Sequence, residues 1–492
     1  MSIHEYDLIV IGSGPAGEKG AAQAAYFGKK VAMVERSPHL GGAAAGTTIP
    51  SKTLRETSLA LSGIRSRQLH GVDLSLRRRA TVQDFLHHEE AMKNIERLRV
   101  SENMLRHSVE IFTGLGAFED RTTVRVMADD GRTELLKGKV ILVATGSSPR
   151  WPDNFPQSKY IYDSDTILQL KQLPKSMVIV GGGVIGCEYA CTFAALGIDI
   201  CLLHSRDLLL PFLDRDISVA LQKSMAKMGI NLKMSVTVKS CNEKSKGVEI
   251  ETESGEIIKA DAVMLATGRT SNTDELRLEM AGIAPGRRGL LVVDENYQVI
   301  DPDSHETVPG IYAAGDVIGP PALASTSMEQ ARYAMIKAFD LDPYKEHVAL
   351  LLPYGIYTIP ECSGVGKTEE QCADEGIDYV VGKADYNSNA RGMITGDQDG
   401  FLKLHFKLSD NQQGPMSLVG VHVIGENATE IVHTGLAALM MNASHELFIN
   451  TCFNYPTLSE LYKYATYDAL GKRARRLNPG QADHLAEVEC HR

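Results

Sequence analysis

The chain has 492 residues, of which 43% are hydrophobic and 23% are charged, and its formal net charge at pH 7 is −11. This composition is typical of a soluble globular protein of about three domains and excludes a disordered or fibrous chain. The negative charge argues against a nucleic acid as partner, because proteins that bind the phosphate backbone are usually basic.

No apolar run approaches the roughly 18 residues that a membrane-spanning helix needs. The first predicted strand begins at Tyr6, which leaves no room for a cleavable leader. We therefore expect a cytoplasmic protein with no membrane partner. The cysteines show no C-x-x-C spacing, which favours free thiols. Cys187 and Cys191 share a helix face, but buried small residues are the favoured interpretation, and the sequence predicts no metal site.

The first predicted elements are a buried strand, an alanine-rich helix and a second strand, over residues 6–11, 18–27 and 31–34. The turn after the first strand carries Gly12, Gly14 and Gly17 in the spacing G-x-G-x-x-G. In this pattern the glycines permit a tight turn, the approach of a pyrophosphate and close packing of the helix on the strand. Glu35 ends the second strand, where a carboxylate binds ribose hydroxyls. The segment therefore predicts a dinucleotide-binding fold.

The same pattern recurs in the middle of the chain. A strand is predicted over residues 177–180, followed by a helix through Ala195 and a second strand over residues 200–203. The turn between the first strand and the helix carries Gly181, Gly183 and Gly186. Two nucleotide sites are therefore expected, one for each glycine turn.

The second site lacks the carboxylate of the first. His204 stands at the same offset from its glycine turn as Glu35 does, and Ser205 and Arg206 follow it. A carboxylate would repel a 2′-phosphate, whereas these residues tolerate or attract one. We expect NADP to be accepted as well as NAD. The alternative, that Arg206 points to solvent and the site is selective for NAD, stays open.

Further glycine turns follow other short strands. Gly146 and Gly268 each end an apolar run, and Asp316 ends a strand near residues 310–315. A helix is predicted over residues 324–339, with its N-terminus placed to stabilise negative charge on a bound cofactor.

In this order the motifs resemble the family of glutathione reductase and dihydrolipoamide dehydrogenase, over the chain to about residue 470. The resemblance implies an α/β fold of two Rossmann-like dinucleotide-binding domains, for FAD and NAD(P), with a C-terminal α+β dimerisation domain. The implied boundaries are residues 1–152 and 282–347 for the FAD-binding part, 153–281 for the NAD(P)-binding domain, 348–470 for the dimerisation domain and 471–492 for a polar tail.

The resemblance also implies the roles of individual residues. The FAD site would contain Gly12, Gly14, Gly17, Glu35, Thr48, Lys52, Gly146 and Asp316. The nicotinamide nucleotide site would contain Gly181, Gly183, Gly186, His204, Ser205, Arg206 and Gly268. Lys52 and Glu188 resemble the family's ion pair beside the flavin, and the alternative interpretation of this pair is a salt bridge that ties two domains together.

Three positions depart from the family's pattern. Ala43 and Thr48 occupy the positions of the two redox cysteines, and Tyr455 occupies that of the histidine that serves the thiol. Neither a methyl group nor a hydroxyl passes electrons to a disulfide, and a phenol with a pKa near 10 is a poor proton shuttle at pH 7. Disulfide substrates are therefore disfavoured. Glu460, the partner of that histidine in relatives, either bonds Tyr455 or caps a helix.

Several longer phrases, such as that of residues 355–361, are similar to those of the family's transhydrogenases. These imply an enzyme that passes hydride between NAD(H) and NADP(H) through bound FAD by a ping-pong mechanism. Such relatives commonly retain the first cysteine, so Ala43 departs from them too. The alternatives are an NAD(P)H diaphorase or quinone reductase of the same fold, and a non-catalytic flavin-binding pseudoenzyme.

The C-terminal region resembles the family's dimerisation domain, which implies a homodimer or a higher homo-oligomer with Tyr455 acting across the interface. A glycine-rich turn is predicted at residues 364–366 and a helix near residues 430–441. Basic runs at residues 77–79 and 472–476 are interpreted as a solvated face and part of the tail. Cys490 is not expected to act as a redox shuttle, because no internal disulfide is there to exchange with it.

Overall fold

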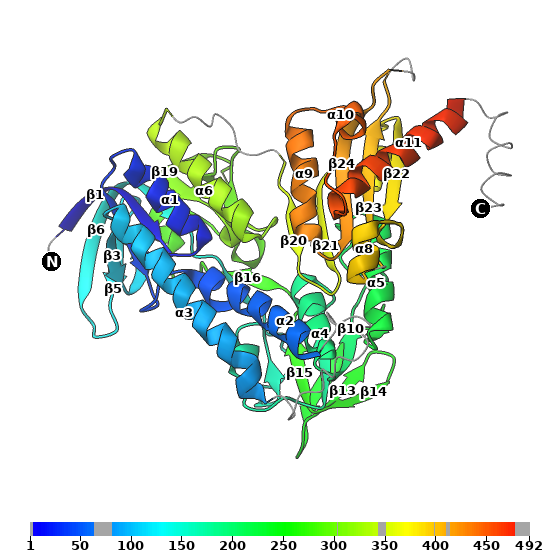
Figure 1. The fold of residues 1–492 in the computed structure, drawn as a ribbon. Helices are drawn as coiled ribbons and strands as arrows, with labels where there is room; N and C mark the ends of the chain where they lie inside the picture. Colours follow the sequence, from blue (N-terminus) through cyan, green and yellow to red (C-terminus); the bar gives the residue numbers. More distant parts are fainter. Residues whose placement is uncertain are drawn as a thin grey trace.

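The computed structural model describes residues 3–62, 81–302, 304–342, 351–397, 399–409 and 414–477. The predicted basic run at residues 77–79 and Cys490 lie outside this part of the chain. Its strands form three larger sheets, of nine, five and five strands, and two smaller ones, of three and two strands. Figure 1 shows the N-terminal region on one side and the C-terminal region on the other.

The largest sheet takes its strands from two separate stretches of the chain. The first stretch contains β1 (Ile3–Ile11), α1 (Pro15–Tyr26), β2 (Val31–Glu35), the single π-helical turn η1 (Ala44–Thr48), α2 (Ile49–Ser62), α3 (Val82–Arg106), β3 (Glu110–Thr113), β4 (Leu115–Phe118), β5 (Thr123–Met127), β6 (Thr133–Val143) and β7 (Ser147–Pro149). The second contains η4 (Leu278–Ala281), η5 (Arg287–Gly289), β17 (Val292–Val293), β18 (Gln298–Ile300), β19 (Thr307–Ala313), η6 (Asp316–Ile318) and α6 (Ala324–Phe339).

The strand order of this sheet is β17-β18-β19-β6-β1-β2-β3, and the strands from β19 to β3 run parallel. Parallel strands covered on both faces read as continuous apolar runs, as in Leu8 to Ile11 of β1. Helices α1 and α6 lie side by side on one face (Figure 1). Gly20 lets α1 pack closely on the sheet, because a Cβ there would lie 2.4 Å from a methyl group of Leu142 in β6.

The second sheet is parallel and has the order β11-β10-β9-β15-β8. A three-stranded sheet, β12-β13-β14, and the pair β7-β16 adjoin it. This region contains β8 (Ile161–Tyr162), η3 (Thr166–Gln169), β9 (Ser176–Val180), α4 (Val184–Ala195), β10 (Asp199–Leu203), α5 (Arg215–Lys227), β11 (Asn231–Lys233), β12 (Val238–Glu243), β13 (Val248–Thr252), β14 (Ile257–Ala260), β15 (Ala262–Leu265) and β16 (Arg269–Ser271).

The third sheet is antiparallel and has the order β20-β21-β24-β23-β22. Helices α9 and α11 pack against it (Figure 1). The region contains β20 (Tyr354–Ile356), β21 (Glu361–Gly366), α7 (Glu369–Asp374), β22 (Tyr379–Asp385), η7 (Tyr386–Ser388), α8 (Ala390–Thr395), β23 (Phe401–Lys407), β24 (Ser417–Gly425), α9 (Ala428–Met440), α10 (Glu446–Asn450), η8 (Leu458–Glu460) and α11 (Leu461–Leu477).

Two expectations for this region were wrong. Residues 364–366 are not a turn but the end of β21, where Gly364 leaves room for the Tyr354 hydroxyl, 2.3 Å from an added Cβ. Residues 471–477 do not begin the polar tail but continue α11. Their basic side chains have partners, since Lys472 pairs with Asp468 at 2.7 Å and Arg476 with Asp378 at 2.7 Å. The first pair lies within α11 and the second joins α11 to the residue before β22, and residues beyond Leu477 are not described.

One apolar core joins the three regions. It contains Leu54 of α2, Phe85 of α3, Phe193 of α4, Ile356 of β20 and Phe401 of β23, all of them buried. Helix α2 therefore lies between the first sheet, α4 and the C-terminal region, as Figure 1 shows. This packing brings residues from three distant stretches of the chain to one place.

Among the helices of the described residues, none combines the length and the apolar composition that a transmembrane span requires.

Candidate functional site

The first glycine turn, between β1 and α1, has the close contacts that its sequence predicts. A Cβ on Gly12 would lie 2.4 Å from the carbonyl oxygen of Ala144, and one on Gly17 would lie 1.9 Å from that of Gly12. Gly14 differs, because no atom lies within 4 Å of its would-be Cβ. It is the N-cap of α1 and provides no side chain to the first amides of the helix. These amides and the open space above them form a cradle for a phosphate group.

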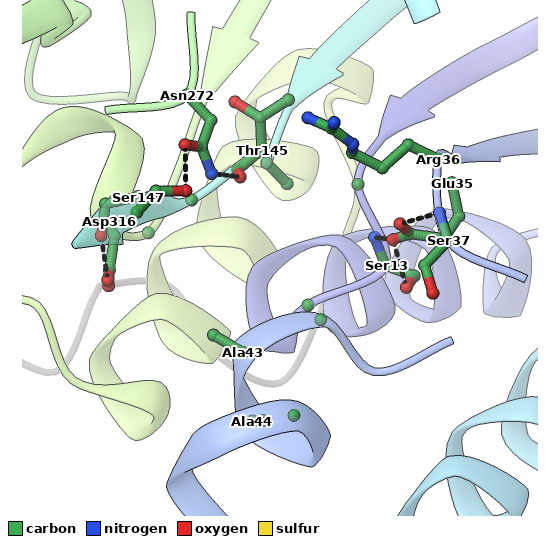
Figure 2. A pocket seen from close by; sticks show the side chains of 18 of the residues that line it. Ser13, Glu35, Arg36, Ser37, Ala43, Ala44, Thr145, Ser147, Asn272 and Asp316 are labelled. Carbon is green, nitrogen blue, oxygen red and sulfur yellow. Dashed lines mark hydrogen bonds between the residues drawn. The ribbon is translucent and has the colours of Figure 1, made fainter. Parts of the chain in front are cut away.

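Glu35 lies at the end of β2 beside this cradle and is buried. Its Oε2 accepts hydrogen bonds from the backbone N–H of Ser13 at 2.9 Å and from the Ser13 hydroxyl at 2.6 Å, and its Oε1 accepts from the backbone N–H of Ser37 at 2.9 Å. Figure 2 shows these contacts at one end of the pocket. The carboxylate is therefore held in place next to the glycine turn.

A cavity of about 930 Å³ extends from this turn across the carboxyl ends of the strands. Of the residues predicted for the FAD site, it is lined by Gly12, Gly14, Glu35, Thr48, Gly146 and Asp316. Ala43 lines it as well, so both positions of the redox cysteines face the cavity, and no cysteine or methionine is among its described lining residues. The cavity is a long, polar-ended space that suits a dinucleotide.

Two further observations test whether the cavity fits FAD. Gly14, Gly46 and Gly146 all lack any neighbour within 4 Å of an added Cβ, so side chains there would fill space that the cavity leaves open. The Thr145 hydroxyl oxygen is buried, lines the cavity and has no hydrogen-bond partner among the described residues. An open cradle and an unpaired polar atom are both expected where a polar cofactor binds. The residues present therefore fit the group.

Asp316 lies at the other end of the cavity, where η6 begins. Its Oδ2 accepts a hydrogen bond from the Ser147 hydroxyl at 2.8 Å, as Figure 2 shows. The Ser147 oxygen in turn accepts from Nε of Arg269 at 2.7 Å. The carboxylate that is predicted to bind the ribityl chain is thus oriented by β7 and β16.

Lys52 and Glu188 form an ion pair of 2.7 Å between α2 and α4. Glu188 is buried, and its other oxygen accepts a hydrogen bond from the backbone N–H of Tyr357 at 2.8 Å. The Lys52 ammonium lies 5.3 Å from the centre of the Tyr357 ring, which is within the range of a cation–π contact. The structure brings together the predicted pair and adds Tyr357, which the sequence analysis did not assign although it lies in a phrase shared with relatives.

The second glycine turn repeats the geometry of the first. A Cβ on Gly181 would lie 2.2 Å from the Ala266 carbonyl oxygen and one on Gly186 would lie 1.9 Å from that of Gly181, whereas Gly183 has no neighbour within 4 Å. Gly183 is the N-cap of α4 and, like Gly14, leaves the first amides without a side-chain cap. Gly268 follows β15 with φ at +106°, which favours glycine, and an added Cβ there would meet no atom.

His204 takes the structural place of the missing carboxylate. Its Nδ1 accepts a hydrogen bond from the backbone N–H of Gly182 at 3.1 Å, just as Glu35 accepts from the N–H of Ser13. Because Nδ1 accepts, a neutral imidazole carries its proton on Nε2, and this atom is buried without a partner among the described residues. Burial, together with the charge of Arg206, lowers the pKa of His204. The ring is therefore neutral at pH 7 and presents a donor.

The remaining predicted residues lie apart from these clusters. Ser205 and Arg206 are exposed beside His204. Tyr455 is 76% exposed and is not among the described residues that line the cavity. Glu460 ends η8, and no hydrogen bond between it and Tyr455 is found in the described part of the chain.

Together, two glycine turns that cradle phosphates, a cavity for a dinucleotide and a third, antiparallel sheet define a protein of the flavin- and nicotinamide-dependent oxidoreductase class. The family model for pyridine nucleotide-disulphide oxidoreductases matches residues 6–333, and the model for the dimerisation domain of the same family matches residues 352–466. The chain belongs to this family.

Curated relatives match nearly the full chain. A soluble pyridine nucleotide transhydrogenase from Mycobacterium tuberculosis is 42% identical over 480 residues, which cover 97% of this chain and 99% of the relative. One from Pseudomonas putida is 38% identical over 477 residues, which cover 96% and 100%. Among solved structures, LpdA from Mycobacterium tuberculosis superposes with a TM-score of 0.84 at 25% identity, over 94% of this chain and 99% of that one.

Proposed function

We propose that this protein is an FAD-dependent transhydrogenase that passes hydride between NAD(H) and NADP(H) without a redox-active disulfide. The proposal rests on a dinucleotide cavity in which Ala43 and Thr48 occupy the two positions of the redox cysteines. Relatives that match nearly the full chain bear the name of this activity. Bound FAD supplies a ring that takes up hydride from one nicotinamide and returns it to another. The rest of the work falls to binding and orientation by the chain.

The residues of the two sites divide this work between them. The amides at the start of α1 bind the FAD pyrophosphate, while Glu35 and Asp316 bind hydroxyl groups of the same cofactor. The amides at the start of α4 bind the pyrophosphate of either nicotinamide nucleotide. Both nicotinamide nucleotides use the same site, at the turn of Gly181, Gly183 and Gly186. The first must therefore leave before the second binds, which makes the mechanism ping-pong. Lys52, held by Glu188, contributes a fixed positive charge that favours the electron-rich form of the cofactor.

The dimerisation match supports a homodimer, in which the exposed Tyr455 completes the flavin site of the partner subunit. We also propose that the domains have the boundaries inferred from the sequence, apart from the extension of α11 to Leu477, and that the protein is cytoplasmic.

The decisive experiment is an anaerobic titration of the purified flavoprotein with NADPH, followed by addition of thio-NAD. We expect the flavin absorption to bleach and then to return as thio-NAD is reduced. A flavin that does not bleach contradicts catalysis and supports a pseudoenzyme, whereas bleaching without reduction of thio-NAD but with fast reduction of a quinone supports a diaphorase. Rapid turnover of lipoamide or oxidised glutathione would contradict the sulfur-free mechanism.

The role of His204 in nucleotide choice is tested by His204→Glu. The new carboxylate accepts from Gly182 as Glu35 does from Ser13, and it repels a 2′-phosphate, so we expect the KM for NADPH to rise about 10- to 100-fold relative to that for NADH. His204→Gln is the matched control, because its amide oxygen accepts the same hydrogen bond without charge. Steady-state kinetics with both nucleotides measures the effect. Strict rejection of NADPH by the unmodified protein would refute dual specificity.

A further inference from the structure

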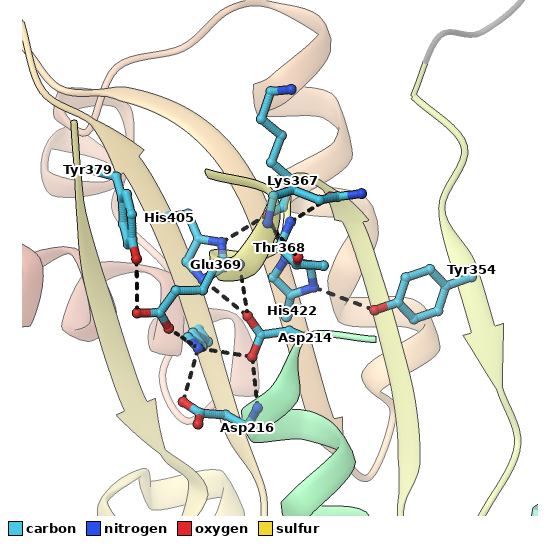
Figure 3. Close-up of polar contacts among 11 residues, drawn as sticks. Asp214, Asp216, Tyr354, Lys367, Thr368, Glu369, Tyr379, His405 and His422 are labelled. Carbon is cyan, nitrogen blue, oxygen red and sulfur yellow. Dashed lines mark hydrogen bonds and ion pairs between the residues drawn. The ribbon is translucent and has the colours of Figure 1, made fainter. Parts of the chain in front are cut away.

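A buried polar cluster lies where the N-terminus of α5 meets the C-terminal sheet. Figure 3 shows it: Asp214 is the N-cap of α5, His405 lies on β23 and His422 on β24. All three residues are fully buried, with 0% of their surface exposed. None of them takes part in the proposed transhydrogenase mechanism.

The hydrogen bonds of the two histidines determine where their protons lie. The carbonyl oxygen of Lys367 is 2.9 Å from Nδ1 of His405 and 2.9 Å from Nε2 of His422. A carbonyl oxygen only accepts, so both nitrogens must carry hydrogen. In neutral rings, Nε2 of His405 and Nδ1 of His422 are therefore bare lone pairs.

The lone pair of His405 faces a carboxylate, whereas that of His422 faces the Tyr354 hydroxyl. Nε2 of His405 has no hydrogen-bond partner among the described residues and lies 3.4 Å from Oδ2 of Asp214. Nδ1 of His422 has only a long contact of 3.4 Å with the Tyr354 hydroxyl. Each of the three residues offers one ligand atom, and these atoms lie within 4.8 Å of one another. In a neutral His405 ring, the bare Nε2 and the Asp214 carboxylate repel each other in this buried space unless a cation lies between them.

Lys403 does not provide that cation. Its ammonium donates to Oδ1 of Asp214 at 2.9 Å, to Asp216 at 3.0 Å and to Glu369 at 2.6 Å. An ammonium group has three donors, so none is left for the histidines or for Oδ2 of Asp214. Oδ2 of Asp214 accepts one long hydrogen bond, from the backbone N–H of Glu369 at 3.3 Å. Asp216 and Glu369 are partly exposed to solvent, which screens their charges, so a cation is missing only beside Oδ2 of Asp214 and Nε2 of His405.

Protonation of the histidines is a poor substitute for a metal ion here. Burial lowers the pKa of His405, and burial together with the neighbouring His405 lowers the pKa of His422 to about 4. Both rings stay neutral at pH 7, which is the form that binds metal ions.

From this arrangement we propose that Asp214, His405 and His422 bind a structural zinc ion. Two imidazole nitrogens and one carboxylate oxygen are ligands that Zn²⁺ accepts. Tetrahedral bonds of about 2.0–2.1 Å place neighbouring ligands about 3.3–3.4 Å apart, which matches the 3.4 Å between His405 and Asp214. A water molecule completes the tetrahedron. The shared Lys367 carbonyl is the outer partner that orients both imidazoles.

Glycines make the space for these rings. A Cβ on Gly364 would lie 2.7 Å from Nδ1 of His422, and one on Gly420 would lie 3.0 Å from Nδ1 of His405. The zinc ion would fasten α5 of the nucleotide-binding region to the C-terminal sheet. Because the ligands are fully buried, the ion would enter while the chain folds rather than afterwards.

The test is the metal content of the full-length, untagged holoprotein, expressed in medium containing Zn²⁺ and purified without chelators. Plasma mass spectrometry after gel filtration should find about one zinc ion per chain, falling below about one tenth in Asp214→Asn and His422→Gln. His445→Gln is the matched control: it removes a buried histidine of the same region, whose Nδ1 accepts from the backbone N–H of Met416 at 3.1 Å, and it should keep its zinc.

A second measurement needs no variant and therefore does not depend on whether the variants fold. Zinc-edge X-ray absorption of the unmodified protein should show two imidazole ligands at about 2.0–2.1 Å. An unmodified protein without zinc would overturn the proposal. It would indicate instead that a proton is shared by Nε2 of His405 and Oδ2 of Asp214, which lie 3.4 Å apart. Unchanged zinc in folded Asp214→Asn and His422→Gln, or a spectrum without imidazole ligands, would overturn it as well.

Discussion

We expect Lys52→Met to slow the reduction of bound flavin by NADPH by about 10²–10³-fold while the protein keeps its FAD. Lys52 is only partly buried, but its ion pair with Glu188 and its contact with the Tyr357 ring hold the ammonium in one place. A positive charge that is already held in position stabilises the electron-rich cofactor more than the charge of a mobile side chain, which must first be ordered. Anaerobic stopped-flow absorption measures the rate of bleaching, and the absorption spectrum of the purified protein measures the bound flavin.

The control for this change is Lys239→Met, which removes an ion pair of similar length, 2.6 Å to Glu251, on the surface of the second region. Exposed pairs contribute little, so both the rate and the stability should stay near those of the unmodified protein. If Lys52→Met lowered the melting temperature but left the rate of bleaching unchanged, the pair would be an interdomain salt bridge and no more.

The second large effect is expected from Gly183→Val, which should raise the KM for both NADH and NADPH by at least about 100-fold. Gly183 has ordinary extended backbone angles and no neighbour within 4 Å of an added Cβ, so valine fits the folded chain. Its branched side chain instead fills the space in front of the α4 amides, where the pyrophosphate is proposed to bind. Flavin content and melting temperature should stay unchanged.

Gly186→Val tests the close packing of helix on strand at the same turn, where Gly183 instead borders open space. A Cβ there would lie 1.9 Å from the carbonyl oxygen of Gly181, so the helix has to move away from the strand. We expect a loss of more than about 4 kcal/mol in the free energy of unfolding, measured by chemical denaturation. A Gly183→Val protein with unchanged KM values would contradict the assignment of this turn to the nicotinamide nucleotide.

Predictions from the sequence were most accurate where short-range geometry decides the outcome. The helix predicted over residues 324–339 has those bounds in the structure, and the strands that precede each glycine turn end where expected. They were least accurate where a glycine is needed because a residue distant in the sequence packs against it. Gly364 looks like a turn residue but lies in β21. This position needs glycine because Tyr354 and His422 occupy the space where a side chain would be.

The amino-acid sequence by itself determined the two nucleotide folds, the order of their elements and the loss of sulfur from the redox positions. These properties depend on backbone sterics over a few residues and on which atoms a side chain possesses, and both can be read from neighbouring letters.

Only the tertiary structure decided which distant groups meet. Lys52 and Glu188 are 136 residues apart and pair because α2 packs on α4, and His204 proves to accept from Gly182 in the manner of a carboxylate. The convergence of Asp214, His405 and His422 had no sequence signal at all. Their meeting is set by the shared apolar core that packs three regions together, and no local spacing along the chain encodes that packing.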